Sequence, residues 1–421
     1  MNIYFSGMGG VGIGPLAEIA SDMGFSIQGS DLYEGLMTEE LESRGIPVSV
    51  GPQDGTFLQS CHDAAPIDWF VYTAALPDDH AELALARELG IRVSKRDEFL
   101  SYMIKEKGLK LIAVSGSHGK TTTTGMLVWL FTQLGIPVSY AIGTTLSFGP
   151  NGKYDPSSEY FIYECDEYDR NLLHFSPYVA IIPSVDYDHP DSYPTVEDYL
   201  SAFRQFVHQS DKAILWQADA DYIKTRDPST WCLQDDELRE IKLPGIHNRR
   251  NGTLVLKALE HLGIGDNATN RDVLEQFPGT DRRFEKLADN LYTDYGHHPV
   301  EIAATLQLAK EVADTVMLVY QPHQNRRQHE IKDDYTDQFE HADLVYWVPT
   351  YLSREDPNQA ILTPEELFAH VTNKEVFHAA DMDSKLWDVI QRERANGTLV
   401  LGMGAGTIDG WLREQLRDSR S

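Results

Sequence analysis

The feature that most constrains the fold of this chain is a glycine-containing turn at residues 116–121, Gly-Ser-His-Gly-Lys-Thr. An apolar run at residues 109–114 precedes it, and a helical pattern follows it. This order is typical of a phosphate-binding loop, because glycines let backbone N–H groups approach phosphate oxygens and the helix N-terminus adds partial positive charge. We expect Lys120 to reach the β- and γ-phosphates and the Thr121 hydroxyl to bind Mg²⁺. The turn is two residues shorter than the general GxxxxGK[ST] pattern. A turn that binds nothing is nevertheless disfavoured, because the order of strand, turn and helix is that of a phosphate-binding loop.

Two further polar groups follow apolar, strand-like runs. Residues 164–169 (Glu-Cys-Asp-Glu-Tyr-Asp) contain Glu164, and residues 186–191 (Asp-Tyr-Asp-His-Pro-Asp) contain His189. Either group alone fits a solvated acidic turn or a structural histidine. The carboxyl ends of neighbouring strands in α/β proteins form ligand sites, however, so the conjunction with the phosphate-binding loop is more specific. It predicts phosphate or metal chemistry at these strand ends, with Thr121 and Glu164 as candidate oxygen ligands of Mg²⁺.

A second glycine-rich turn lies near the N-terminus at residues 7–12, Gly-Met-Gly-Gly-Val-Gly. Asp31 follows the next strand-like run, 19 residues after Gly12. This arrangement resembles the dinucleotide-binding fingerprint, in which glycines allow the backbone to approach a pyrophosphate. NAD, FAD and a nucleotide sugar all fit such a pattern, and so does a plain tight turn.

Composition restricts the partners of the chain. Its 421 residues include 65 acidic and 36 basic side chains, which give a formal net charge of −29 at pH 7. Such a surface repels phosphate backbones and anionic lipids, so we expect no nucleic-acid partner and no membrane partner. A small anionic ligand remains compatible, because backbone amides and a few placed cations can hold it. The cysteines Cys61, Cys165 and Cys232 share no metal-ligand spacing, and no signal peptide is evident. We therefore expect a cytoplasmic protein.

Length and the alternation of strand-like and helical runs predict an α/β protein with more than one domain. We place three blocks at residues 1–108, 109–279 and 280–421, with a polar hinge at Lys107-Gly108. The first and third blocks both read as doubly wound, mostly parallel sheets.

Further sequence clusters match no general chemical pattern. They are residues 243–248 with Asn251, residues 282–284 (Arg-Arg-Phe), residues 294–299 (Asp-Tyr-Gly-His-His-Pro) and residues 321–323 (Gln-Pro-His). The adjacent His297 and His298 would point to opposite faces of a strand. We therefore do not expect that pair alone to bind a metal.

Taken in order, these motifs resemble the Mur ligase family over residues 2–410. The resemblance implies a Rossmann-like N-terminal domain for a UDP-sugar, a central P-loop ATPase domain and a Rossmann-like C-terminal ligase domain. It implies ATP and Mg²⁺ as cofactors. It also implies an amide-forming reaction of peptidoglycan precursor synthesis that passes through an acyl phosphate. The N-terminal glycine-rich turn would then bind UDP rather than NAD.

The resemblance also implies roles for individual residues. The catalytic residues would be Lys120, Glu164, His189 and Arg283, and the metal ligands would be Thr121, Glu164 and His189. The ATP-binding residues would be Gly116, Ser117, His118, Gly119, Lys120, Thr121, Thr122, Asn248, Asn251, Arg283 and Asp294. The UDP-sugar would contact Gly9, Gly10, Val11, Gly12, Asp31 and Thr73. The amino acid would contact Tyr295, His297, His323 and Arg327.

Within the family, the branch that this sequence resembles most joins L-alanine to UDP-N-acetylmuramate. Three positions depart from it: Gln324 and Cys165 replace a usual Arg and a usual Ala, and Tyr168 is typical of the branch that attaches a recycled peptide to the same sugar nucleotide. The change at Gln324 leaves the identity of the amino acid open. Three alternatives remain. The chain could be the ligase that attaches a recycled peptide, or a nucleotide-binding homologue without catalysis. The N-terminal glycines alone would also fit an NAD-dependent oxidoreductase. A monomer and a homodimer are both compatible with the sequence.

Overall fold

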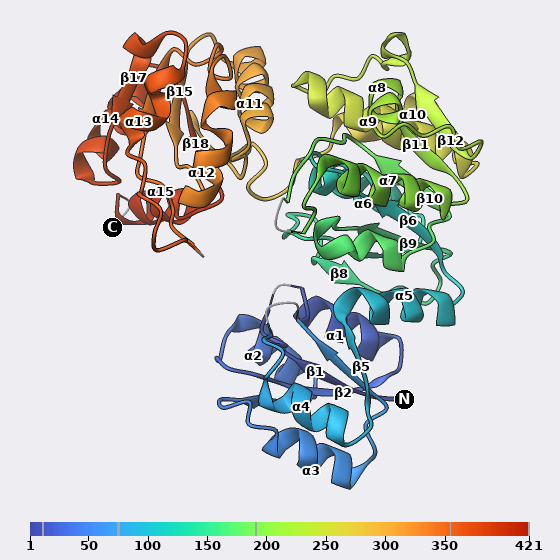
Figure 1. Cartoon of the computed structure of the whole chain (residues 1–421). Coiled ribbons are helices and arrows are strands. Elements are labelled where there is room, and N and C mark those ends of the chain that lie inside the picture. Colours follow the sequence, from blue (N-terminus) through green and yellow to red (C-terminus); the bar gives the residue numbers. More distant parts are fainter. Residues whose placement is uncertain (11, 74–75, 190–191, 354, 420–421) are drawn as a thin grey trace. The chain divides into compact units, whose positions relative to one another are not determined.

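The computed structural model describes residues 1–10, 12–73, 76–189, 192–353 and 355–419. They form three α/β domains, each built on its own sheet, which confirms the predicted fold class (Figure 1). The chain divides into two compact units, Met1–Leu238 with Thr253–Phe277 and Arg239–Gly252 with Pro278–Ser421. The predicted boundaries at residues 108 and 279 stay predictions. Among the helices of the described ranges, none combines the length and the apolar character that crossing a membrane requires.

The N-terminal domain is a doubly wound sheet. Its strands are β1 (Asn2–Ser6), β2 (Ser26–Asp31), β3 (Val48–Val50), β4 (Trp69–Tyr72) and β5 (Arg92–Lys95), all parallel, in the order β3-β2-β1-β4-β5. Its helices are α1 (Gly14–Asp22), α2 (Leu36–Ser43), α3 (Thr56–Ala64), α4 (Ala81–Glu88) and α5 (Arg96–Glu106). Alternate residues of β1 face opposite sides of the sheet. Ile3 and Phe5 pack in the core that contains α1 and α5, whereas Tyr4 packs with α3 and α4.

The central domain has a seven-stranded sheet in the order β12-β11-β10-β6-β9-β7-β8, in which only the β7–β8 pair is antiparallel. Its strands are β6 (Lys110–Val114), β7 (Val138–Ala141), β8 (Gly152–Lys153), β9 (Tyr160–Glu164), β10 (Val179–Ile182), β11 (Ala213–Trp216) and β12 (Thr230–Leu233). Its helices are α6 (Lys120–Gln133), η1 (Tyr168–His174), α7 (Val196–His208), α8 (Gln217–Tyr222), η2 (Asp235–Glu237), α9 (Ile246–His261) and α10 (Ala268–Glu275). The part of α9 before Thr253 belongs to the second unit. Because β10, β6 and β9 are neighbours, their carboxyl ends meet at one edge.

The C-terminal domain has a six-stranded sheet in the order β13-β14-β18-β15-β16-β17. Its strands are β13 (Glu285–Ala288), β14 (Leu291–Asp294), β15 (Val316–Tyr320), β16 (Leu344–Trp347), β17 (Phe377–Ala379) and β18 (Leu399–Met403). Its helices are α11 (Pro299–Val312), α12 (Asn325–Ile331), η3 (Lys332–Tyr335), α13 (Pro364–Leu367), η4 (Phe368–His370), η5 (Lys374–Val376), α14 (Ser384–Ala395) and α15 (Ile408–Asp418). Leu318 packs in the core with α11, and Val319 packs with α14 and α15. Both faces of this sheet are therefore covered.

Candidate active site

The glycine-containing turn between β6 and α6 has the backbone of an anion-binding loop. Gly116 has a φ of +151°, and a Cβ atom there would lie 2.6 Å from the carbonyl oxygen of Ser184. Gly119 has a φ of +81° and is the N-cap residue of α6. These positions therefore need glycine, for space at Gly116 and for a left-handed conformation at Gly119. The N-terminus of the 14-residue helix α6 adds partial positive charge to the loop.

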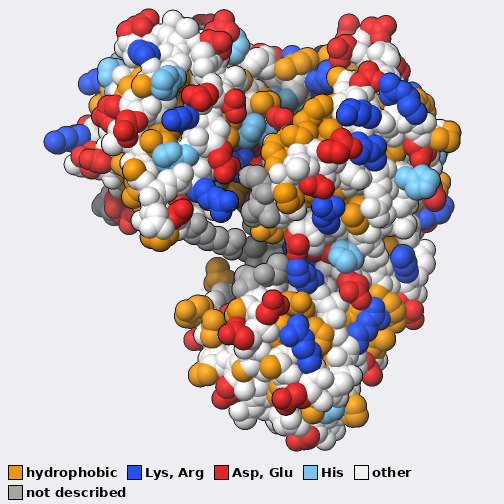
Figure 2. Space-filling view, viewed as in Figure 1, with side chains coloured by type: hydrophobic (Ala, Val, Ile, Leu, Met, Phe, Trp, Pro, Cys, Tyr) orange, Lys and Arg blue, Asp and Glu red, His pale blue; other side chains and the backbone are white. Residues whose placement is uncertain are grey.

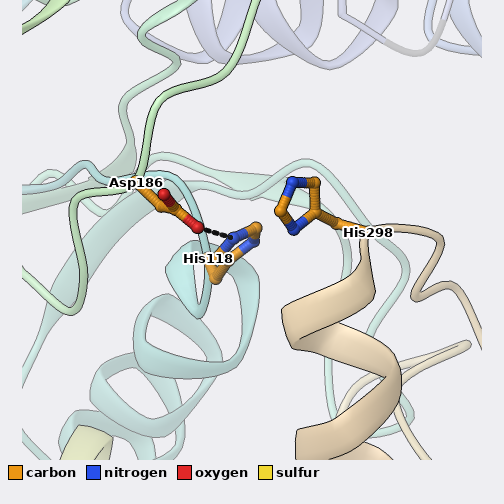
Figure 3. A group of neighbouring side chains, drawn as sticks. All are labelled: His118, Asp186 and His298. Atoms are coloured by element: carbon orange, nitrogen blue, oxygen red, sulfur yellow. Dashed lines mark ion pairs between the residues drawn. The ribbon is translucent and has the colours of Figure 1, made fainter. Parts of the chain in front are cut away.

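The loop is anchored to the segment that follows β10. Ser117 Oγ donates to the carbonyl of Asp186 at 2.5 Å, accepts from the N–H of Asp186 at 2.6 Å, and lies 2.8 Å from the hydroxyl of Tyr199. The N–H of His118 donates to Ser184 Oγ at 3.1 Å. Figure 3 shows the ring of His118 facing the carboxylate of Asp186, with Nε2 and Oδ2 3.8 Å apart. Side chains from α7 and from the end of β10 thus shape the loop.

Lys120 is held inside the loop by an acidic residue. Its Nζ donates to the carbonyl of Gly116 at 2.5 Å and lies 3.0 and 2.8 Å from the two carboxylate oxygens of Glu167. Burial alone would lower the pKa of Lys120, but Glu167 and Asp166 outweigh it and raise the pKa above its ordinary value. Burial likewise favours the neutral form of Glu167, yet Lys120 and His189 lower the pKa of that carboxyl. Lys120 is therefore a cation at neutral pH.

The predicted strand-end residues do come together. Glu164, at the end of β9, accepts hydrogen bonds from Thr121 Oγ1 at 2.6 Å and from the N–H of Gly143 at 2.8 Å. His189 follows β10, and its Nε2 lies 3.5 Å from Glu167 Oε1. Burial lowers the pKa of His189, but the nearby carboxylates outweigh that effect and raise it. The neighbouring motif residues Pro190 and Asp191 lie outside the described residues.

The donor set beside the loop fits Mg²⁺. Thr121 Oγ1, in the first turn of α6, and Glu164 Oε1, at the end of β9, are neighbouring oxygen atoms, and Mg²⁺ is bound in proteins through oxygen. A carboxylate has about four acceptor positions, so the hydrogen bonds to Glu164 leave room for a metal ion. Imidazole nitrogen is a less typical ligand for Mg²⁺, so His189 is the weakest member of the predicted set.

The N-terminal glycine-rich turn is closed by its predicted partner. Asp31 Oδ2 accepts from the N–H of Gly9 at 2.7 Å, and the side chain of Thr73 lies 3.1 Å from where a Cβ of Gly7 would be. At Gly12 a Cβ would lie 2.5 Å from Nη1 of Arg96. The turn thus has a cation beside it that the sequence motifs did not single out, because Arg96 is distant in sequence. The predicted contact Val11 lies outside the described residues.

The predicted ATP contacts Asn248, Asn251, Arg283 and Asp294 belong to the second unit. Asn248 Nδ2 donates to the carbonyl of Pro244 at 2.9 Å. Asp294 accepts from the N–H groups of Phe284 at 2.8 Å and of Gly296 at 2.7 Å, which fixes the chain that follows Arg283. Burial raises the pKa of Asp294 to about 6.

The four predicted amino-acid contacts form one cluster in the second unit. Arg327 Nη1 lies 3.3 Å from His297 Nε2, and the ring of His297 lies 5.6 Å from Tyr295 and 5.5 Å from His323. Burial lowers the pKa of His297 to about 4 and also lowers the pKa of His323. The cluster therefore pairs one permanent cation with two neutral imidazoles.

The expectation that His297 and His298 lie on a strand is wrong. Strand β14 ends at Asp294, and His298 is the N-cap residue of α11. Pro299 begins that helix, and a proline favours the first helical position because its missing N–H would have no partner there.

Family models match nearly the whole chain. The Mur ligase family, catalytic domain, matches residues 2–107; the Mur ligase middle domain matches residues 114–255; and the Mur ligase, glutamate ligase domain matches residues 282–406.

Curated and solved proteins are similar over the same length. The UDP-N-acetylmuramate–L-alanine ligase of Rickettsia canadensis is 31% identical, over 98% of this chain and 95% of that protein. The enzyme of the same name from Caldanaerobacter subterraneus is 29% identical, over 96% and 95%. The solved UDP-N-acetylmuramate-alanine ligase MurC of Thermotoga maritima has a TM-score of 0.76 and 25% identity, over 100% and 99% of the two chains. A murein peptide ligase of Psychrobacter arcticus, with a TM-score of 0.64 and 23% identity over 99% and 98%, shares the fold.

Proposed function

This chain belongs to the Mur ligase family of ATP-dependent ligases, and from that premise we propose that it joins L-alanine to UDP-N-acetylmuramate. The names of relatives that align along the full chain support this pair of substrates. The product would be a peptidoglycan precursor. A cytoplasmic location, where such nucleotide sugars are made, stays a prediction, and so does the oligomeric state.

The proposed reaction has two steps. A carboxylate oxygen of the lactyl group attacks the γ-phosphorus of ATP; a P–O bond forms, and the bond to the leaving ADP oxygen breaks. The amine of L-alanine then attacks the carbonyl carbon of the resulting acyl phosphate, phosphate leaves, and the nitrogen loses a proton. Positioning and charge neutralisation supply most of the catalysis in a phosphoryl transfer of this kind.

The residues of the phosphate-binding loop fit the first step. Lys120 carries the permanent charge that the β- and γ-phosphates need, and the backbone of residues 116–119 leads into the positive end of α6. Thr121 and Glu164, with His189, would hold Mg²⁺. When bound, Mg²⁺ neutralises charge on the β- and γ-phosphate oxygens.

The cluster around His297 fits the second substrate. Arg327 can bind an α-carboxylate through parallel hydrogen bonds. The imidazoles of His297 and His323 are neutral at pH 7, so they do not repel a cationic amino group. The unprotonated nitrogen of each ring can accept a hydrogen bond. The roles of Asn248 and Arg283 in ATP binding stay predictions.

One observation carries the proposal. Side chains that follow three neighbouring strands converge beside the loop. Thr121 Oγ1 lies 2.6 Å from Glu164 Oε1, and Lys120 Nζ lies 3.0 Å from Glu167 Oε1. This arrangement supports a catalytic protein over a homologue that has lost catalysis, because Lys120, Thr121, Glu164 and His189 all lie beside the same loop.

The test is phosphate release with ATP, Mg²⁺ and UDP-N-acetylmuramate against a panel of single amino acids and short peptides. We expect turnover with L-alanine. Turnover with glycine or L-serine but not with L-alanine would change the assigned amino acid. Phosphate release that no single amino acid or peptide stimulates would overturn the proposal.

The recycling reaction is the second candidate, and Tyr168 favours it. The ring of Tyr168 packs edge-to-face on His189, with centroids 5.2 Å apart, so this residue contacts the candidate active site. Turnover with a tripeptide and with no single amino acid would assign that activity instead.

A further inference from the structure

Glu167 is a buried carboxylate to which the proposed reaction gives no role. It lies three residues after Glu164 in residues 164–169, which we call the acid motif, and it is 0% exposed. Its oxygens lie 3.0 and 2.8 Å from Lys120 Nζ, and Oε1 lies 3.5 Å from His189 Nε2. Lys120 follows β6 and His189 follows β10, so one anion contacts side chains from two strand ends while its own backbone follows a third, β9.

The backbone of Glu167 is itself fixed. Its carbonyl accepts a hydrogen bond from the hydroxyl of Tyr193, a fully buried residue, and another from the N–H of Arg170 at 3.1 Å. A side chain on such a rigid backbone has few alternative positions. The carboxylate can therefore act as a fixed reference for the more flexible lysine and histidine that contact it.

We propose that Glu167 is a positioning residue for phosphoryl transfer, which sets Nζ of Lys120 and the ring of His189 through a single carboxylate. The inference rests on the proposed function, because it takes Lys120 as the phosphate contact and His189 as a metal ligand. By engaging Nε2 of His189, Glu167 leaves Nδ1 as the ring nitrogen available to a metal ion. Histidines that bind metals commonly present their other nitrogen to a carboxylate in this way, which fixes the tautomer and the orientation of the ring.

The charge of Glu167 is essential to this role. A neutral amide offers one acceptor oxygen and an NH₂ group, and that NH₂ group would face either the lysine ammonium or the N–H of the imidazole. A glutamine at this position can therefore hold only one of its two partners. Aspartate keeps the charge, but its side chain is one methylene shorter, so the carboxylate lies farther from Lys120 and His189.

The experiment compares Glu167→Gln and Glu167→Asp with a matched control, Asp169→Asn. Asp169 is an exposed carboxylate of the same acid motif that pairs with Lys95, and its φ of +52° suits asparagine. Mn²⁺ serves as the metal probe in the presence of ADP, and its binding is measured by electron paramagnetic resonance. We expect the dissociation constant of Mn²⁺ to rise about 10- to 100-fold in Glu167→Gln, as for other carboxylates behind metal-binding histidines. The rise should be smaller in Glu167→Asp and absent in Asp169→Asn.

A second readout separates positioning from a merely structural role. In wild type, pulsed resonance should detect imidazole nitrogen bound to Mn²⁺, and this coupling should weaken in Glu167→Gln. If Mn²⁺ binding and the nitrogen coupling match wild type while only the melting temperature falls, the residue is structural and the inference is overturned. If Glu167→Gln does not fold, Glu167→Asp decides by the same criteria. Failure of wild type to release phosphate with L-alanine would overturn the proposed function, but the Mn²⁺ comparison would still decide the role of Glu167.

Discussion

At the scale of the residue, Gln324 occupies a position where the family resemblance leads us to expect an arginine. It is the N-cap residue of α12, and Arg327 lies in the first turn of that helix. Among the described residues, its side chain makes no hydrogen bond. Because Gln324 carries no charge, we expect Arg327 to be the one strong cationic contact that L-alanine makes in the proposed acceptor site.

Gln324→Arg should consequently lower the KM for L-alanine about tenfold, because a hydrogen bond to a charged group contributes about 1.5–3 kcal/mol. Initial rates at saturating ATP and UDP-N-acetylmuramate measure the effect. Gln276→Arg, at an exposed position beyond α10, adds the same charge elsewhere and should leave KM unchanged. An unaltered KM in Gln324→Arg would show that position 324 does not face the acceptor carboxylate.

Buried titratable groups of the second unit predict how stability varies with pH. Burial lowers the pKa of His247 and of His297 to about 4, and it raises the pKa of Asp294 to about 6. Between about pH 6 and pH 4 the unfolded chain binds one proton on each of His247 and His297, whereas the folded chain leaves both histidines neutral. The folded chain binds one on Asp294 that the unfolded chain largely lacks. The unfolded state thus binds about one proton more, and these groups make stability fall as the pH drops through this window.

His297→Gln removes one of the two histidine contributions, so the remaining two groups should nearly cancel. We expect the slope of unfolding free energy against pH to be about 1.4 kcal/mol per pH unit shallower than in wild type between pH 6 and pH 4. Urea unfolding at several pH values measures it. Parallel curves for the variant and the wild type would mean that His297 is protonated in the folded protein.

At the scale of the element, the sequence could predict the meeting of strand ends because the pattern is local. Apolar runs identified β6, β9 and β10, and parallel neighbours necessarily bring their carboxyl ends to one edge. The role of Glu167 could not be predicted in the same way. Its motif also contains Glu164, Asp166 and Asp169, and only the three-dimensional path of the chain decides which carboxylate faces Lys120.

The N-terminal part of α9 shows a second limit of sequence reasoning. Arg249 donates to both carboxylate oxygens of Glu311 at 2.8 and 2.9 Å, and the N–H of Gly245 donates to the same side chain at 2.8 Å. Residues 239–252 belong to the same compact unit as Glu311, and the predicted block boundary at residue 279 stays a prediction. No periodicity or spacing reveals a partner 62 residues away.

Helix α7 supports the phosphate-binding loop through Tyr199. Its hydroxyl lies 2.8 Å from Ser117 Oγ, and its ring packs edge-to-face on Tyr187 and Tyr193. Tyr199→Phe keeps the ring and removes one hydrogen bond worth about 1 kcal/mol. We expect the KM for ATP to rise about fivefold with little change in the KM for UDP-N-acetylmuramate, as steady-state kinetics would show. Tyr222→Phe, at an exposed tyrosine, is the control, and equal changes in both KM values would contradict a local effect on the loop.

At the scale of the whole molecule, the net charge of −29 opposes the binding of the proposed anionic substrates. Figure 2 shows acidic and basic side chains interspersed over the visible surface. ATP and UDP-N-acetylmuramate are both anions, so the long-range field repels them. The contacts that attract them, at Lys120 and at the glycine turns, act within a few ångströms. The two effects differ in range, and salt can therefore separate them.

Added salt should speed the capture of the anionic substrates. At about 0.15 M salt, charges more than about 8 Å apart are largely screened, whereas contacts inside a binding site are screened much less. We expect kcat/KM for ATP and for UDP-N-acetylmuramate to rise about two- to fivefold between about 10 and 150 mM KCl at constant free Mg²⁺. L-Alanine has no net charge, so its kcat/KM is the internal control and should stay constant. A fall for the two anions would mean that the local positive potential of the site extends beyond the protein surface and overcomes the global charge.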